Sequence, residues 1–124
     1  TFGGNPLAMA VATAVVDELL SPDFLDHVRK IAGHMQQYLS MLAAQHPGVI
    51  AEVRGQGLLL GLKLHVPSAA FLAKLRENRF LAVGATENVV RLLPPLIIDE
   101  TQVKEAFDAL SSACASFETE RKAV

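Results

Sequence analysis

The sequence predicts an α/β fold, more narrowly an α+β sandwich in which helices cover one face of a small, largely antiparallel sheet. Three observations predict it. Of the 124 residues, 51% are apolar, which is enough to build one core. Apolar residues recur at helical spacing in long segments, and short β-prone segments bounded by glycine and proline lie between them. The expected order is two helices, two strands, a helix, two strands and a helix, which leaves one sheet face to dock on a partner.

The first helix is expected to follow Asn5 and Pro6. Asn5 can cap a helix that begins at Pro6, because the N–H that proline lacks would have no helical partner at that position. The helix continues over residues 7–20 and is apolar on nearly every side. This pattern is typical of a helix that is buried between two larger bodies.

A second helix is expected after Ser21-Pro22-Asp23, where a capping residue and a proline occur together again. The sequence His46-Pro47-Gly48 ends it. Its apolar residues recur at helical spacing and are Phe24, Leu25, Val28, Ile31, Met35, Leu39 and Leu42.

Residues 49–54 and 58–65 are expected to form two strands joined at the corner Gly55-Gln56-Gly57, and the second strand should be central in the sheet. A third helix should run from Pro67 and Ser68 to about Asn78. Its apolar side is formed by Phe71, Leu72 and Leu75.

Residues 80–83 and 89–93 are the last two expected strands. Asp99 and Gln102 form a capping-box pair, so the last helix should run from about Glu100 to Phe117, and the polar tail of residues 118–124 should be frayed. The buried stripe of this helix consists of Val103, Ala106, Phe107, Leu110 and Cys114.

Charge and cysteine content exclude several classes of function. With 11 basic and 13 acidic residues the formal charge is −2, so neither a nucleic acid nor an anionic membrane is expected as the main partner. The single cysteine, Cys114, is expected to pack in the core, which suits a reducing cytosol. Apolar runs are far shorter than a membrane helix requires, which predicts a cytoplasmic protein that binds small molecules or another protein.

Neither a metal site nor a dinucleotide site is expected. The four histidines, His27, His34, His46 and His65, are too dispersed to chelate one ion and are expected at helix surfaces and ends. The glycines of the corner at residues 55–57, with Gly61, lack the spacing and the following helix of a dinucleotide fingerprint.

Arg91 and Thr1 are the candidate binding residues. Arg91 lies in an apolar strand-like run, where an unpaired charge would be costly. From the residues alone, either it binds a substrate carboxylate bidentately or it forms a structural salt bridge to Glu87 or another acid. Thr1, beside Gly3 and Gly4, offers a hydroxyl and an N–H to a phosphate oxygen, but the residues alone favour a flexible lead-in to the helix. Arg54, next to the glycine corner, is interpreted as structural.

Three stretches, in this order, resemble the last third of class III transaminases of the acetylornithine aminotransferase type. They are Thr1-Phe2-Gly3-Gly4-Asn5-Pro6-Leu7-Ala8, Val53-Arg54-Gly55-Gln56-Gly57-Leu58-Leu59-Leu60-Gly61 and Glu87-Asn88-Val89-Val90-Arg91-Leu92-Leu93-Pro94-Pro95-Leu96. The resemblance covers essentially the whole chain. Two positions depart from it, namely Gln56, where relatives often carry lysine, and Gly84, where proline is common.

The resemblance implies a fold type I pyridoxal 5'-phosphate enzyme, a homodimer with active sites shared between the two chains. It identifies residues 1–20 as an active-site loop and domain-linking helix, and residues 21–124 as the C-terminal small domain. It assigns Arg91 to the substrate carboxylate and Thr1 to the cofactor phosphate of the neighbouring subunit. The hard chemistry of such an enzyme is supplied by the cofactor.

The resemblance also implies that the lysine that carries the cofactor lies in a large domain. The lysines of this chain fall on expected helix faces, strands or the tail, and none has a setting that would lower its pKa; they are Lys30, Lys63, Lys74, Lys104 and Lys122. We therefore expect a fragment without a catalytic residue of its own, inactive alone, with the catalytic lysine preceding Thr1 in the complete protein.

The function expected of the complete enzyme is transfer of the terminal amino group of N-acetylornithine to 2-oxoglutarate, a step of arginine biosynthesis. Its partners would be amino acids and 2-oxo acids. The alternatives are another class III transaminase, acting on succinylornithine, succinyldiaminopimelate, ornithine or 4-aminobutyrate, and a non-catalytic α/β interaction module.

Overall fold

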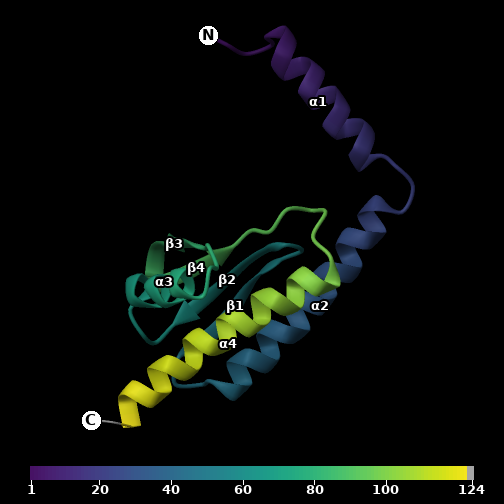
Figure 1. Ribbon diagram of the computed structural model, residues 1–124. Coiled ribbons are helices and arrows are strands. Elements are labelled where there is room, and N and C mark those ends of the chain that lie inside the picture. Colours follow the sequence, from purple (N-terminus) through teal and green to yellow (C-terminus); the bar gives the residue numbers. More distant parts are fainter. Residues whose placement is uncertain (123–124) are drawn as a thin grey trace.

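The computed structural model describes residues 1–122 and contains, in the expected order, helices that pack on an antiparallel sheet, with one helix standing apart (Figure 1). The elements are α1 (Pro6–Leu19), α2 (Phe24–Gln45), β1 (Ile50–Gln56), β2 (Leu59–Leu64), α3 (Ser68–Glu77), β3 (Val83–Ala85), the 3-10 turn η1 (Thr86–Asn88), β4 (Val89–Leu92) and α4 (Glu100–Lys122).

The sheet has the order β1-β2-β4-β3, and every neighbouring pair is antiparallel. The predicted central position of the second strand is confirmed, because β2 pairs with β1 on one side and with β4 on the other. Alternate residues of β2 and β4 face opposite sides of the sheet. Leu60, Leu62 and Leu64 are buried on one side, whereas Leu59 and Arg91 are exposed on the other.

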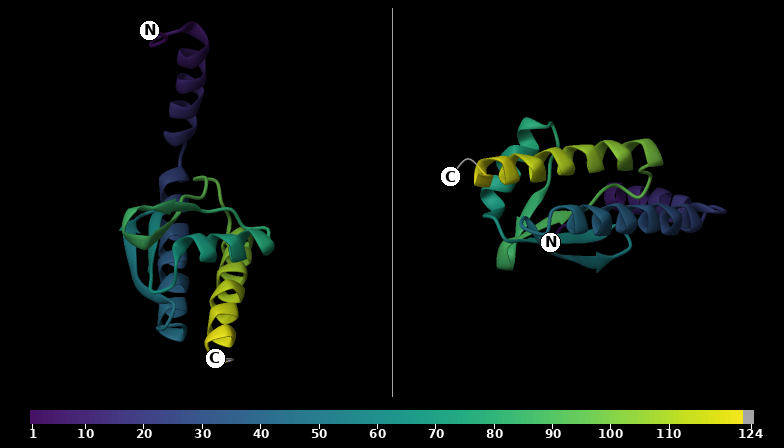
Figure 2. Two further views of the ribbon diagram at one scale, coloured as in Figure 1. Left: turned by 90° about the vertical axis from the view of Figure 1, so that its left-hand side faces the viewer. Right: turned by 90° about the horizontal axis from the view of Figure 1, so that it is seen from below.

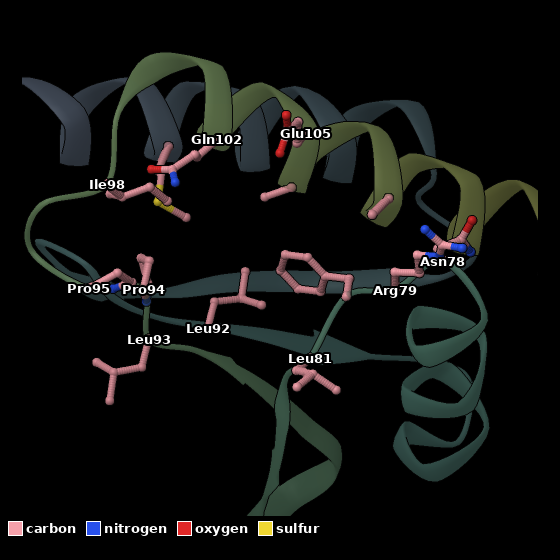
Figure 3. A pocket seen from close by; sticks show the side chains of 14 residues that line it. Asn78, Arg79, Leu81, Leu92, Leu93, Pro94, Pro95, Ile98, Gln102 and Glu105 are labelled. Atoms are coloured by element: carbon pink, nitrogen blue, oxygen red, sulfur yellow. The ribbon is translucent and has the colours of Figure 1, made fainter.

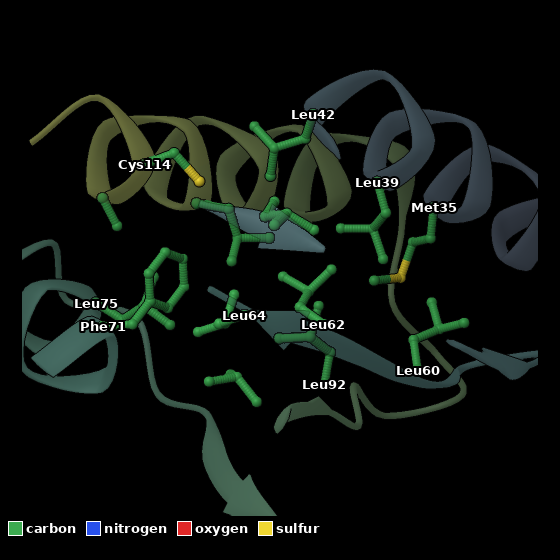
Figure 4. Close-up of a cluster of buried hydrophobic side chains, with 14 of the residues drawn as sticks. Met35, Leu39, Leu42, Leu60, Leu62, Leu64, Phe71, Leu75, Leu92 and Cys114 are labelled. Carbon is green, nitrogen blue, oxygen red and sulfur yellow. The ribbon is translucent and has the colours of Figure 1, made fainter. Parts of the chain in front are cut away.

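One hydrophobic core joins the buried sheet face to α2, α3 and α4 (Figure 4). Leu62 of β2, Leu39 of α2, Leu75 of α3 and Leu110 of α4 are all at most 2% exposed. Within residues 1–122 no helix covers the opposite face of the sheet, where Leu59 and Arg91 are exposed, as expected from the order of elements. We call this second face, which bears Arg54, Leu59, Gly61, Lys63, Val89 and Arg91, the open face.

The first helix begins as predicted but is not buried. The Asn5 side chain accepts a hydrogen bond from the backbone N–H of Ala8 at 2.9 Å, and Pro6 occupies the first turn. However, α1 has no buried residue, and Leu7 and Leu20 are 75% and 76% exposed. The helix projects away from the sheet (Figures 1 and 2), so nothing in the described chain covers its apolar surface.

The start of α2 differs from the expectation in detail. The helix begins at Phe24, and Asp23 precedes it with a left-handed φ of 66° and makes no side-chain capping bond. The Ser21 hydroxyl donates instead to the carbonyl of Glu18 at the end of α1. Leu25, on the first turn of α2, is 47% exposed, and the first buried residue of the helix is Ile31.

Several element boundaries differ from the prediction. The first strand continues through Gly55 and Gln56, so the turn lies at residues 57 and 58 rather than 55–57. The third strand spans Val83–Ala85 rather than residues 80–83, because only this segment pairs with β4, through Val83 opposite Arg91. The last helix does not fray after Phe117 but continues to Lys122, while residues 123 and 124 lie outside the described part. Its capping box is confirmed, since Asp99 and Gln102 exchange hydrogen bonds at 2.8 and 3.1 Å.

Candidate functional site

The open face carries two arginines in one row across three strands. In the strand register Arg54 of β1 is opposite Gly61 of β2, and Gly61 is opposite Arg91 of β4. Directly opposed residues of antiparallel strands point to the same side, so both guanidinium groups belong to this face. A shallow depression of about 410 Å³ lies here and is lined by Arg54, Gly55, Leu59, Leu60, Gly61, Val89 and Arg91.

Gly61 makes room between the two arginines. A Cβ at this position would lie 3.0 Å from Cγ1 of Val89, so any side chain here would enter the space above the central strand. Glycine in the middle of a strand often marks a place where a ligand approaches the backbone closely. The row therefore has two cationic side chains with a residue that lacks a side chain between them.

Arg91 is exposed and has no acidic partner among the side chains that the structure describes. The structural salt bridge to Glu87 that the sequence left open is absent from the structure. The carboxylate of Glu87 contacts Arg54 instead, with Oε2 3.2 Å from Nη1, and lies 4.0 Å from Nζ of Lys63. A planar guanidinium without an acidic partner can bind a carboxylate by donating two parallel hydrogen bonds to it.

Arg54 is held by two carboxylates. Its Nε donates to Glu52 at 2.8 Å on the same strand, and its Nη1 donates to Glu87 at 3.2 Å across the sheet. The hydrogen bond to Glu52 is the main cause, and that to Glu87 the next, of a rise in the pKa of Arg54 above its ordinary value. Arg54 thus stays cationic and engaged, in contrast to Arg91.

Thr1 lies in the exposed segment before α1. Asn5 organises this segment: its Nδ2 donates to the carbonyl of Phe2 at 2.7 Å while its Oδ1 caps the helix. Gly4 has a φ of +75°, and a Cβ at Gly3 or Gly4 would meet nothing within 4 Å. The N-terminus is at the end of α1 remote from the sheet (Figures 1 and 2), so one chain does not bring Thr1 and Arg91 together.

A depression of about 620 Å³, which was not expected from the sequence, lies between α4 and the segment that follows β4 (Figure 3). Apolar groups such as Leu81, Leu93 and Pro95 line much of it, with Gln102 and Glu105 on α4. Leu81 and Leu93 are 83% and 66% exposed. The sequence carried little signal for this depression, because Leu81 and Leu93 lie within the expected strands 80–83 and 89–93, where apolar residues are ordinary.

No lysine whose side chain is described suits covalent attachment of an aldehyde cofactor. Such a lysine needs a desolvated or cation-rich pocket that lowers its pKa. The pKa values of Lys74 and Lys104 are instead raised by hydrogen bonds to Glu120 and Asp108. Lys30 is 2.8 Å from Glu100, and Lys63 lies beside Glu87 on the open face.

The histidines and the cysteine lie apart from the open-face row. His27 contacts the carbonyl of Ile98 at 3.0 Å, and His46, at the end of α2, lies 3.0 Å from Glu118 of α4. Burial, and then the charge of Glu118, raises the pKa of Cys114 to about 12. Within residues 1–122 no group of three or more histidine, cysteine or acidic side chains could hold a metal ion, and no helix there could cross a membrane.

Comparison with known proteins identifies a family. The family model described as aminotransferase class-III matches residues 1–114. The chain is 49% identical to acetylornithine aminotransferase 1 of Bradyrhizobium diazoefficiens over 94% of its own length and 29% of that protein. It is 47% identical to the acetylornithine aminotransferase of Agrobacterium fabrum, again over 94% and 29% of the two chains.

Solved structures agree in fold. The acetylornithine aminotransferase of Elizabethkingia anophelis has a TM-score of 0.84 at 30% identity, covering 94% of this chain and 31% of that one. An ornithine aminotransferase of Toxoplasma gondii, described as having pyridoxal phosphate at partial occupancy in its active site, has a TM-score of 0.87 at 30% identity, over 98% and 30%. The chain thus spans about 30% of the length of the relatives that it matches.

Proposed function

Because this chain belongs to the class III aminotransferase family, we propose that it is the C-terminal part of a pyridoxal-phosphate-dependent enzyme. The complete enzyme moves the terminal amino group of N-acetylornithine to 2-oxoglutarate, in arginine biosynthesis in the cytoplasm. Curated relatives named acetylornithine aminotransferase, at 43% to 49% identity over most of the chain, support this choice of substrate. Residues 1–20 are the active-site loop and linking helix, and residues 21–124 are the small domain.

The observation that carries the proposal is the state of Arg91. Its guanidinium is exposed on the open face, without an acidic partner among the described side chains, beside the bare backbone of Gly61. A substrate carboxylate arriving there would accept two parallel N–H bonds, which fix both its position and its orientation. We assign Arg91 to the carboxylate of the amino acid and of the 2-oxo acid.

The segment around Thr1 fits a phosphate group. It combines an exposed hydroxyl, glycines that leave the backbone open to an anion, and the N-terminal end of α1, whose dipole favours negative charge. Pyridoxal phosphate, when bound, supplies the electron sink of transamination. Thr1 holds the cofactor phosphate, and Arg91 orients the substrate.

The separation of Thr1 from the sheet within one chain supports a site shared by two subunits of a homodimer. In that arrangement Thr1 of each subunit serves the active site that contains the partner's Arg91. The lysine that carries the cofactor belongs to the remaining part of the enzyme, since the described lysines are engaged with acids. This chain by itself is accordingly inactive.

Replacement of Arg91 by alanine in the complete enzyme tests the proposal. We expect the KM for N-acetylornithine to rise by at least about thirtyfold, because a charge-assisted pair in an enclosed site is lost. Arg29→Ala is the matched control, since Arg29 pairs with Asp26 on α2, away from the open face. An unchanged KM in the Arg91 variant would show that another group binds the carboxylate.

Ornithine is the alternative amino donor, because solved ornithine aminotransferases share this fold. Ornithine aminotransferases of Plasmodium falciparum and Toxoplasma gondii match the fold with TM-scores of 0.85 and 0.87. The two donors differ in the acyl group on the α-nitrogen. Comparison of kcat/KM for ornithine and N-acetylornithine decides between them.

A further inference from the structure

We propose that Arg54 is a positioning residue that keeps Arg91 available to substrate by holding the carboxylate of Glu87. The proposal rests on the assignment of Arg91 to the substrate carboxylate. Its basis is the arrangement of charges on the open face, where Glu87 lies near two cations, Arg54 and Lys63, and Arg91 is left without an acidic partner among the described side chains.

Glu87 is the acid nearest to Arg91 along the chain. It lies in the turn η1 that leads into β4, four positions before Arg91. A fully extended chain over this separation would place the Cα atoms about 13 Å apart, and the left-handed turn at Glu87 and Asn88 shortens this, so a glutamate and an arginine that turn towards each other can bridge it. A released Glu87 would therefore compete with a substrate carboxylate for the same guanidinium.

Arg54 is well placed to prevent this competition. Glu52, on the same strand, fixes the Nε side of its guanidinium at 2.8 Å, which leaves Nη1 directed at Glu87 at 3.2 Å. The second restraint on Glu87 is weaker, since Nζ of Lys63 is 4.0 Å away. Arg54 thus reaches past the central strand to hold an acid that belongs to the turn before β4.

The backbone of Glu87 also restricts where its side chain can go. Glu87 has φ 60° and ψ 31°, a left-handed conformation that costs free energy for a residue other than glycine or asparagine. Asn88 follows with φ 61° and is tied by its side chain to Leu64, Val66 and Ser68. The base of the Glu87 side chain is therefore fixed, and its carboxylate is directed by the cations around it.

Both members of the pair are partly exposed, with side-chain exposures of 40% for Arg54 and 66% for Glu87. Exposed ion pairs contribute little to folding and are weakened by salt. The consequence we infer is therefore one of ligand affinity at Arg91 rather than of stability of the domain.

A double-mutant cycle in the complete enzyme tests the proposal, with calorimetric binding of glutarate, a dicarboxylate without a reacting carbonyl, as the main readout. We expect Arg54→Gln to weaken glutarate binding by about tenfold, and the same change in a Glu87→Gln background to weaken it by less than about twofold. Thermal melting of each variant establishes that the fold is kept, and Arg54→Lys, which can still hold Glu87, restores most of the affinity.

An effect of Arg54→Gln that is as large in the Glu87→Gln background as in the parent would overturn the proposal. Arg54 would then act through its own charge and not through Glu87. Glu52→Gln is the control for loss of one acid on this face. It should leave the affinity for glutarate within about twofold, because an amide oxygen can still accept from Nε of Arg54 and the Arg54–Glu87 contact survives. If Arg91→Ala itself does not alter glutarate binding, the proposed function fails independently of this cycle.

Discussion

Arg54 and Arg91 stand on the same face of the sheet, each directly opposite Gly61 in the strand between them. Two like charges two strands apart would ordinarily disfavour each other. Here one of them is engaged by Glu52 and Glu87 and the other is not. The same side-chain type is therefore engaged by two acids in β1 and has no acidic partner among the described side chains in β4.

The space above Gly61 should be required for binding. Gly61→Leu would place a branched side chain between the two arginines and against Val89, whose Cγ1 would be 3.0 Å from the new Cβ. We expect the Kd of the complete enzyme for glutarate, measured by calorimetry, to rise by at least about tenfold. Gly61→Ala, which fills much less of the depression, should change it by less than about threefold; equal effects of the two would indicate a general distortion of β2.

Gly55 should be irreplaceable for a steric reason. It has a φ of +117°, and a Cβ there would overlap the carbonyl oxygen of Leu59 and lie 2.9 Å from the Cα of Leu60. Gly55→Ala should lower the free energy of unfolding by about 3 kcal/mol or more, as measured by urea denaturation. Gly33→Ala is the matched control, since it adds a methyl group in open space within α2 and should stabilise the helix slightly.

Asn88 should be the main polar contributor to stability near the open face. Its Nδ2 donates to the carbonyls of Leu64 and Val66, both at 2.8 Å, and its Oδ1 accepts from the N–H of Ser68 at 2.7 Å. Asn88→Ala should reduce the free energy of unfolding by about 2–4 kcal/mol through loss of these bonds and of the left-handed preference.

Asn88→Gly separates the two contributions. It keeps the left-handed backbone and loses only the hydrogen bonds, so its unfolding free energy should lie between those of the parent and of Asn88→Ala. A glycine variant as unstable as the alanine variant would assign the whole effect to the hydrogen bonds.

Cys114 should be chemically silent in the folded protein. Burial raises the pKa of its thiol to about 12, so the reactive thiolate is nearly absent at pH 8. We expect a colorimetric thiol reagent to label it only at the rate of unfolding, and promptly in urea. Rapid labelling of the folded protein would contradict this burial.

The same pKa shift gives a pH dependence with a definite sign. A thiol whose pKa is raised by folding binds its proton more tightly in the folded state than in the unfolded state. The contribution of this thiol to the free energy of unfolding is constant at pH values below its ordinary pKa of 9.0. As the pH rises from 9.0 towards about 12, the thiol progressively destabilises the folded state. Replacement by serine would remove this dependence on alkaline pH.

Much of the fold could be predicted because local patterns and tertiary packing agree. The cap at Asn5, the capping box of Asp99 and Gln102 and the central second strand are all consistent with their final environment. The errors in element boundaries occur where tertiary packing, rather than the local sequence pattern, determines the secondary structure. Val83–Ala85 became the strand because it pairs with β4, and the polar segment after Phe117 remained helical as a continuation of a long packed helix.

The site was predictable only in part. An arginine in an apolar strand made Arg91 a candidate, but which acid pairs with which cation depends on strand register. The sequence left a Glu87–Arg91 pair open, whereas the structure pairs Glu87 with Arg54. Register is a long-range property that adjacent residues do not reveal. The burial expected for α1 likewise depends on groups that the chain does not itself supply.

Helix α1 has a consequence for folding. A helix of 14 residues is marginal in water without packing, and the Asn5 cap is a small contribution compared with the cost of helix nucleation. With its valines and leucines facing solvent, α1 gains its stability only when another surface arrives. Order in this segment thus depends on the surface that covers it, and helix formation and docking of that surface are thermodynamically coupled.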